Sequence, residues 1–331
     1  MLTRSLSVIR GIGINADHEY VDGQTSVLEG LLQKYKTCGF DTVEISVPGL
    51  NAIRGGVLIE SEARRVRDIL AAHGLNVTLH CPNNLSLIRN ERHHQVMDAV
   101  LGLAAVLGAR RVVYHSAQIA LHAPYRHLAP LPSEDELREM WERETEALIA
   151  VGRRAADMGV ILAVENRDPH QWEISALGMY GKPAAELAHY HQGMRLDLLV
   201  RQMEAVNLPN VGICLDVGHA FLAAPYWPDP DYLAAIRVCA PWVKHLHFHD
   251  NFGITDDMNE SLGDRLVFGE ADNHMPPGWG RIPLAAVLDI LKAAGYDGLL
   301  VVELRPRYLP YLEEVIAETR RLIAKTWRDG G

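Results

Sequence analysis

Side chains that can bind a metal ion recur at or just beyond the ends of short apolar segments in this 331-residue chain. They are imidazoles and carboxylates, a donor set that suits Zn²⁺, Mn²⁺, Co²⁺ or Fe²⁺ better than a cysteine-type structural zinc. We therefore expect a divalent metal centre, with Zn²⁺ or Mn²⁺ as the leading ions. The candidate ligands are His80, His115, Glu165, Asp216, His219, His247, Asp272, His274 and Glu303.

The two glutamates of this set carry the strongest physical argument. Glu165 and Glu303 each end an apolar run, with immediate contexts AVE and VVE. Burying a carboxylate without compensation costs several kcal/mol, so each needs a cation. No lysine or arginine stands at a comparable place except Arg305. One shared metal ion would compensate both carboxylates.

These residues must be positioned by the elements that precede them. Short runs rich in Val, Ile and Leu show little polar alternation, which is typical of parallel strands buried on both faces. Helical patterns separate them, with Ser61 as an expected N-cap and Gly39 and Gly74 as expected C-terminal residues. The predicted strands are 7–15, 42–47, 76–81, 111–116, 161–166, 211–217, 243–249 and 299–304, and the clearest helices are 26–39, 61–74, 93–108, 133–159 and 282–295.

Eight β-then-α units predict an α/β protein, a (β/α)₈ TIM barrel, with residues 1–331 as a single domain. An open doubly wound sheet is the rival, but no GxGxxG or Walker A sequence follows an early strand. A barrel gathers the ends of all its strands at one mouth. Three long segments that follow strands, 117–132, 167–200 and 250–281, are expected to be loops on that same face.

Composition narrows the function classes. The net charge is −10, which argues against tight, non-specific nucleic-acid binding. None of the four cysteines is in a CxxC pair, and we expect Cys81 and Cys214 to pack in the core. No segment approaches the roughly 18 apolar residues of a membrane span. We expect a cytoplasmic protein with a small-molecule partner, and the oligomeric state, a homo-oligomer included, stays open.

At these residues the sequence resembles the xylose isomerase-like superfamily, which includes endonuclease IV, sugar isomerases and ketose 3-epimerases. The resemblance runs over nearly the whole chain. Its most specific stretches are GICLDVGH at 212–219, KHLHFHDN at 244–251 and DNHMPPGWGRI at 272–282.

The resemblance implies two ligand sets. In the epimerases and isomerases one ion is held by four ligands, which match Glu165, Asp216, His247 and Glu303. In endonuclease IV three zinc ions are held by nine ligands, and those match all nine residues named at the start. One to three ions are thus implied. The tyrosine expected in endonuclease IV after the His80 motif is absent here, and no basic, aromatic-interleaved loop suited to a bent duplex is found.

Two reactions fit such a site. In a sugar or sugar-phosphate isomerase or epimerase, a divalent ion chelates adjacent carbonyl and hydroxyl oxygens, while Glu165 and Glu303 remove and return a proton. In a phosphoester hydrolase, clustered ions generate hydroxide, which would employ the remaining ligands. The acidic chain favours a small phosphodiester over DNA. A metal- or ligand-binding barrel without catalysis is the third class. Arg305, Trp279 and His170 are candidate substrate contacts.

Overall fold

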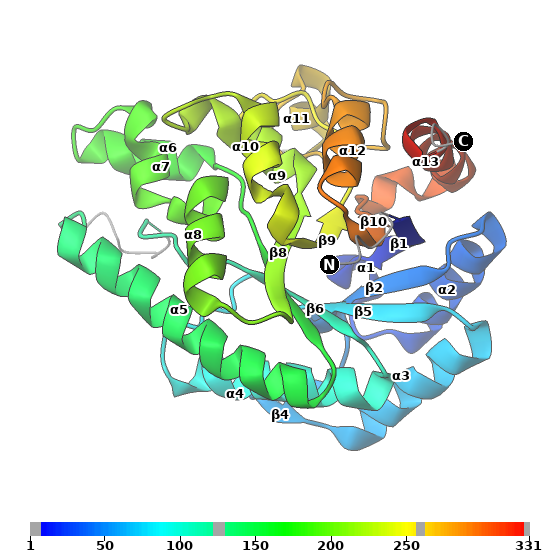
Figure 1. Ribbon diagram of the computed structural model, residues 1–331. Helices are drawn as coiled ribbons and strands as arrows, with labels where there is room; N and C mark the ends of the chain where they lie inside the picture. Colours follow the sequence, from blue (N-terminus) through cyan, green and yellow to red (C-terminus); the bar gives the residue numbers. More distant parts are fainter. Residues whose placement is uncertain (1–7, 122–129, 256–261, 328–331) are drawn as a thin grey trace, which may run out of the picture.

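The computed structural model describes residues 8–121, 130–255 and 262–327, and it forms a closed barrel of parallel strands surrounded by helices (Figure 1). Around the barrel the order is β1-β10-β9-β8-β7-β6-β5-β2, so the strands follow one another as they do in the sequence. The predicted (β/α)₈ fold is confirmed. Its strands are β1 (Val8–Ala16), β2 (Thr42–Ser46), β5 (Asn76–His80), β6 (Arg111–His115), β7 (Ile161–Glu165), β8 (Val211–Asp216), β9 (Val243–His247) and β10 (Asp297–Val302).

Strand register sets the candidate ligands level with one another. Glu165, the last residue of β7, is paired with His115, the last residue of β6. Asp216 at the end of β8 is paired with His247 at the end of β9. Glu303 follows β10 directly. Because all these strands are parallel, their carboxyl ends meet at one mouth of the barrel.

Helices cover the outer surface of the barrel, and the clearest helical patterns are all confirmed. Gly39 and Gly74 end α2 and α3 in the left-handed conformation, with φ of 95° and 61°. The expected N-cap at Ser61 is wrong, because α3 begins at Glu60 and Ile59 is its cap residue. The predicted helices are α2 (Thr25–Cys38), α3 (Glu60–His73), α4 (Glu91–Leu107), α5 (Glu134–Asp157) and α12 (Leu284–Ala293). Three further helices are α8 (Leu196–Val206), α10 (Tyr232–Cys239) and α13 (Leu312–Trp327).

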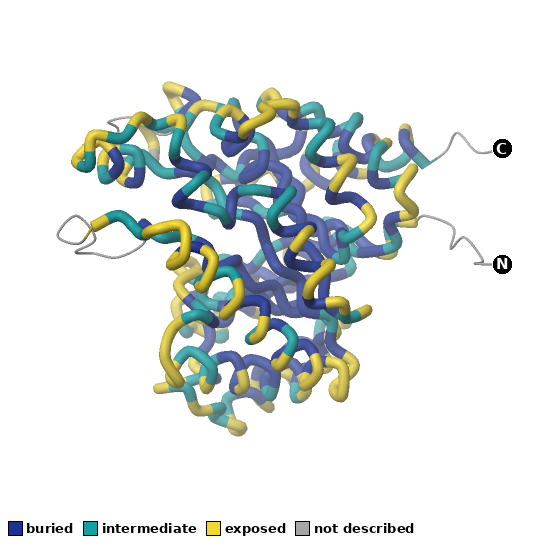
Figure 2. The backbone as a smooth tube through the Cα atoms, turned by 60° about the vertical axis from the view of Figure 1, so that its left-hand side comes forward, coloured by how far each residue is buried: buried dark blue, intermediate teal, exposed yellow. Residues whose placement is uncertain are grey.

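The core has two parts. A large apolar cluster fills the space between strands and helices, and Figure 2 shows the buried strands inside a shell whose outer helix faces are exposed. A small cluster of Val113, Ala163 and Cys214 lies apart from it. Cys81 and Cys214 are both buried, as the sequence indicated.

The long segments beyond the strands are more structured than expected. Residues 167–200 are not a plain loop, because they contain α6 (Gln171–Met179), α7 (Leu187–Tyr190) and the start of α8. The 250–281 segment contains α11 (Leu262–Phe268), while parts of 117–132 and 250–281 lie outside the described residues. A two-stranded hairpin, β3 (Ile53–Arg54) with β4 (Val57–Leu58), adds to the barrel. Among the described helices, none is long and apolar enough to cross a membrane.

Candidate metal centre

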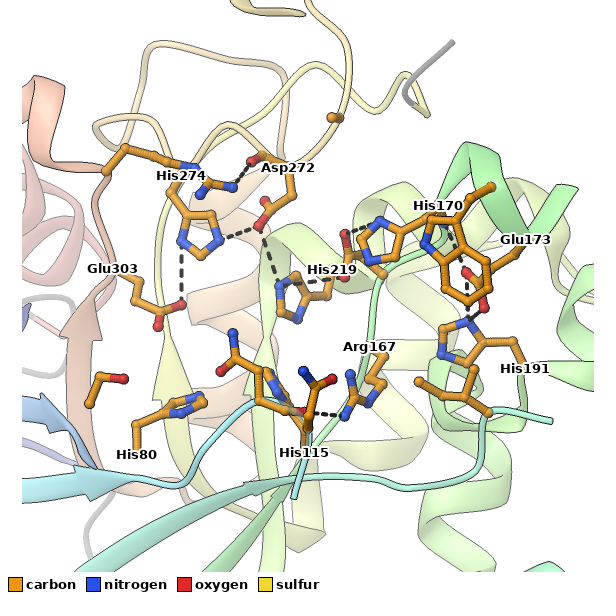
Figure 3. Close-up of a pocket in the computed structure, with 18 of the residues that line it drawn as sticks. His80, His115, Arg167, His170, Glu173, His191, His219, Asp272, His274 and Glu303 are labelled. Carbon is orange, nitrogen blue, oxygen red and sulfur yellow. Dashed lines mark hydrogen bonds and ion pairs between the residues drawn. The ribbon is translucent and has the colours of Figure 1, made fainter. Parts of the chain in front are cut away.

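A cavity of about 1080 Å³ opens at the mouth formed by the strand ends (Figure 3). The nine ligands expected from the sequence all lie at or beneath this cavity. Six of them line it, namely His80, His115, His219, Asp272, His274 and Glu303. The other three are fully buried beneath the lining residues, within reach of them: Glu165, Asp216 and His247.

One donor group matches the four-ligand set expected from the resemblance. Each of Glu165, Asp216, His247 and Glu303 offers a donor atom, and these atoms all lie within 4.8 Å of one another. His247 Nδ1 is 2.7 Å from Glu165 Oε1, 3.4 Å from Glu303 Oε2 and 3.7 Å from Asp216 Oδ2. All four side chains could bind one divalent ion at the same time.

A second donor group forms around the other oxygen of Glu165. His115 Nε2 and His80 Nε2 lie 2.8 and 3.0 Å from Glu165 Oε2. Burial lowers the pKa of His115 to about 4, so its ring is neutral, which is the form that ligates metals. Burial also opposes the charged form of His80, but its hydrogen bond to the Glu165 carboxylate and the charge of that carboxylate prevail and raise the pKa of His80 to about 9.

A third donor group contains one residue that the sequence did not single out. His219, Asp272 and His274 were expected, and His249 joins them within the same 4.8 Å limit. The His249 and His274 rings are stacked, with centroids 4.2 Å apart and planes 7° apart. His249 Nδ1 and Asp272 Oδ1 are both buried without a hydrogen-bond partner in the described structure, 3.7 Å from each other. Two such atoms facing one another are suited to a shared cation.

His249 connects the first and third donor groups. Its Nε2 lies 3.0 and 3.1 Å from the two carboxylate oxygens of Asp216, while its Nδ1 faces Asp272. The ring occupies space that only a glycine leaves open, because a Cβ on Gly218 would lie 2.1 Å from its Cε1. The sequence signal was the alternation of His245, His247 and His249 along one segment, which did not reveal which ring faces the centre.

Glu44 is the second residue that sequence reasoning missed. It is buried on β2, where its Oε1 is 2.7 Å from His247 Nε2 and its Oε2 is 2.8 Å from His245 Nε2 and 2.8 Å from Thr78 Oγ1. Burial opposes its ionisation, but His247 and His245 hold the pKa of Glu44 well below its usual range. Because Glu44 contacts Nε2 of His247, the Nδ1 of that ring is left to face Glu165. A carboxylate in the position of Glu44 commonly orients a metal-binding histidine. Glu44 ends the sequence TVE much as Glu165 ends AVE. The argument that a buried carboxylate needs a cation therefore applies to Glu44 as well.

The donor set fits a divalent cation. In the described part of the chain, the buried carboxylates Glu165 and Asp216 form ion pairs with imidazoles and with no lysine or arginine. Oxygen and imidazole donors converge, and buried donor atoms remain unpartnered. Cys214 also has its Sγ within 4.8 Å of donor atoms of His245 and His247. Burial raises the pKa of Cys214 well above its usual range, so its thiol stays neutral.

The three candidate substrate contacts lie in different surroundings. Arg305 lines the cavity and donates from Nη2 to the Asp272 carbonyl at 2.9 Å. His170 also lines it, with Nδ1 3.5 Å from Asp168 Oδ2. Trp279 does not line the cavity. Its indole N–H donates to Glu314 on α13, and its ring packs edge-on against tyrosines 308 and 311. The glycine turn carries Trp279 to the outer surface, so this geometry gives no support for substrate contact.

Comparison with known proteins agrees with the fold. A family model described as a xylose isomerase-like TIM barrel matches residues 32–326. Fructoselysine 3-epimerase from Escherichia coli O157:H7 is 27% identical over 139 residues, 40% of this chain and 47% of that protein. This chain therefore spans about half the length of the curated relatives it matches.

Solved structures show the same architecture over almost the whole chain. A D-tagatose 3-epimerase-like protein aligns with a TM-score of 0.65 and 20% identity, over 95% of this chain and 98% of its own. A xylose isomerase-like TIM barrel protein from Mycobacterium smegmatis, solved in complex with magnesium, aligns with a TM-score of 0.65 and 16% identity, over 96% and 97% of the two chains. At these identities the likeness shows the fold.

Proposed function

This chain belongs to the xylose isomerase-like TIM barrel family, and from that premise we propose that it is a divalent-metal-dependent sugar epimerase or isomerase. The observation that carries the proposal is the convergence of Glu165, Asp216, His247 and Glu303 within 4.8 Å of one another. Support for a carbohydrate substrate comes from the relatives, which include fructoselysine 3-epimerases.

In this proposal the ion would be held by those four side chains, with Zn²⁺ or Mn²⁺ as the leading candidates. When bound, such an ion acts as a Lewis acid toward a carbonyl and the adjacent hydroxyl of a sugar. Glu165 ends β7 and Glu303 directly follows β10. One of these two carboxylates would remove a carbon-bound proton and the other would return it. Glu303 lines the cavity, whereas Glu165 is fully buried beneath it.

His247 and Asp216 would complete the set without moving protons themselves. Glu44 holds the ring of His247, and Asn166 donates to the Asp216 carbonyl at 3.0 Å while accepting from the Asp216 N–H at 2.9 Å. These contacts fix the donors before substrate arrives. Such preorganisation is what a site needs if proton transfer is to occur between correctly placed groups.

The test is exchange of carbon-bound hydrogen with solvent. Ketoses of five and six carbons are incubated with the Mn²⁺-loaded protein in D₂O, and deuterium beside the carbonyl is followed by NMR. We expect exchange in the wild type and a loss of about 10²-fold or more in Glu165→Gln and Glu303→Gln. Glu142→Gln, on the exposed face of α5, is the matched control. Full exchange in both site variants would refute the assignment of these glutamates.

A second candidate function, hydrolysis of a small phosphodiester, is favoured by one observation. The donor groups of His80 with His115 and of His219 with Asp272 and His274 exceed what one ion needs. Two or three ions would activate water for an in-line displacement. Turnover of bis(p-nitrophenyl) phosphate, lost in a His80→Ala, His115→Ala double variant, would select this function. Hydrogen exchange that survives in that double variant would select the epimerase.

A further inference from the structure

Arg167 places a guanidinium in the wall of the cavity between the donor groups and α6 (Figure 3). Its Nε donates to the Ser116 carbonyl at 2.6 Å and its Nη2 to the Asn83 carbonyl at 2.8 Å. Its backbone N–H donates to the Gly193 carbonyl at 3.1 Å. The side chain is therefore held in one position.

No carboxylate of the described residues lies within ion-pair distance of the Arg167 guanidinium. Both groups that accept its hydrogen bonds are neutral carbonyls, and no described carboxylate forms an ion pair with it. The two bonds use Nε and one hydrogen of Nη2, which leaves Nη1 and the second Nη2 hydrogen for another acceptor. Arg167 is half-buried, and a bound anion in contact with these N–H groups would offset the cost of removing its charge from water.

Two acids in the same cavity wall have histidines, and not Arg167, as their ion-pair partners. Asp168 lies 3.5 Å from His170, and Glu173 lies 2.9 Å from His191. All four of these residues line the same cavity as Arg167. Arg167, like Arg305, therefore meets backbone carbonyls in the cavity wall, whereas these two acids meet imidazoles.

We infer that Arg167 binds an anionic oxyacid group, a carboxylate or a phosphate, at the end of the substrate's carbon chain. The inference rests on the proposed function and names its substrate class. Arg167 follows Glu165 by two residues, and two residues of extended chain span roughly 7 Å. An anionic group on Arg167 would thus leave a short carbon chain to reach the glutamates. The free N–H groups can bind two oxygens of one oxyacid group at once.

The test compares a neutral polyol with its charged analogues. Ribitol, D-ribonate and ribitol 5-phosphate are titrated calorimetrically into the full chain loaded with Mn²⁺, in the wild type, Arg167→Gln, Arg167→Lys and Arg195→Gln. Arg195 is the control, because it is partly buried and paired with Asp197, and does not line the cavity. Metal content and thermal unfolding are measured for each variant. Because a hydroxy acid can also chelate an ion, the decisive comparison is between wild type and variant.

We expect the wild type and Arg195→Gln to prefer at least one charged probe over ribitol by about tenfold or more. Arg167→Gln should lose that preference, and the probe that loses more identifies the group. If Arg167→Gln does not fold, Arg167→Lys decides, with an expected loss of about threefold or more because an ammonium cannot make the paired contact. Equal affinities in the wild type, or an unchanged preference in the folded arginine variants, would overturn the inference alone. If none of the three probes bound, ribitol included, both the inference and the proposed function would be overturned.

Discussion

At the scale of single residues, the centre depends on groups that touch its donors as much as on the donors. Glu44 binds two histidines at once, through His247 Nε2 and His245 Nε2. His249 touches Asp216 with one nitrogen and faces Asp272 with the other. Each is buried, and each fixes the orientation of a proposed ligand. Their removal should therefore change metal affinity without removing a proposed ligand of the four-donor group.

Glu44→Gln should weaken metal binding by about 10- to 100-fold, the usual effect of losing a carboxylate that orients a metal-binding histidine. The dissociation constant is measured by competition with a chelator. Glu144→Gln is the matched control, because Glu144 is an equally buried carboxylate whose partners, such as Tyr114 and Gln118, lie outside the donor groups. If Glu44→Gln and the control bound the metal equally well, Glu44 would not orient His247 for metal binding.

Gly218→Ala should destabilise the fold by about 1–3 kcal/mol, because the new Cβ would overlap the ring of His249. In the His249→Ala background the same change should cost clearly less, because the ring is gone. Urea unfolding of the wild type, both single variants and the double variant measures the coupling. Strictly additive costs would show that Gly218 does not make room for that ring.

At the scale of elements, one aspartate organises the segment that carries Asp272 and His274. Asp250 accepts hydrogen bonds from the N–H groups of Asn251, Gly278 and Ile282, at 3.0, 3.0 and 3.1 Å. Its own backbone is paired with Met275 in both directions. The glycine turn around residue 280 therefore folds back on the end of the 243–249 segment, and this places the third donor group.

Asp250→Ala should lower the free energy of unfolding by about 2–3 kcal/mol, because buried N–H groups lose their acceptor. It should also weaken binding of any ion held by Asp272 and His274. Asp231→Ala is the control, because Asp231 caps α10 on the outer surface and accepts from Ala234. The control should lose about 1 kcal/mol and keep its metal affinity. If Asp250→Ala kept its metal affinity as the control does, the turn would not position the donors of the centre.

Element prediction succeeded where local patterns decide the structure. The strand that ends at Glu165 and the one that ends at Asp216 read as uninterrupted apolar runs, and their parallel pairing follows from the βα alternation. The helices in 167–200 were missed because α6 has His170 as its N-cap, an unusual residue there, and its QWEISALGM sequence lacks a clear apolar stripe. Tertiary contact with the cavity wall, where Glu173 meets His191, stabilises it instead.

At the scale of the whole molecule, barrel closure decides which residues meet. Glu44 and His247 are 203 positions apart, and only the closed order of the strands brings them into contact. For this reason the sequence predicted the ring of strand-end donors, which follows from parallel strands, but not the partners of each donor. The position of Trp279 depended in the same way on a turn whose direction no local pattern determines.

Removal of metal should destabilise the whole barrel, because the donors come from strands that are distant in sequence. An ion present at 100 times its dissociation constant adds about 2.7 kcal/mol to the native state. Thermal unfolding after chelation should therefore occur several degrees lower than after reloading. The Asp216→Asn variant should show a smaller difference. Identical unfolding with and without the ion would mean that the native state does not bind it.

The most direct test of the account is the metal content of the purified chain. Protein stripped with chelator, dialysed against Mn²⁺ or Zn²⁺ and freed of excess ion is assayed by mass spectrometry, alongside Glu165→Gln and Asp216→Asn. We predict at least one ion per wild-type chain and a marked loss in both variants, whose donors belong to the same group. A folded wild type that retains no ion, or variants that retain the full complement, would contradict the central claim.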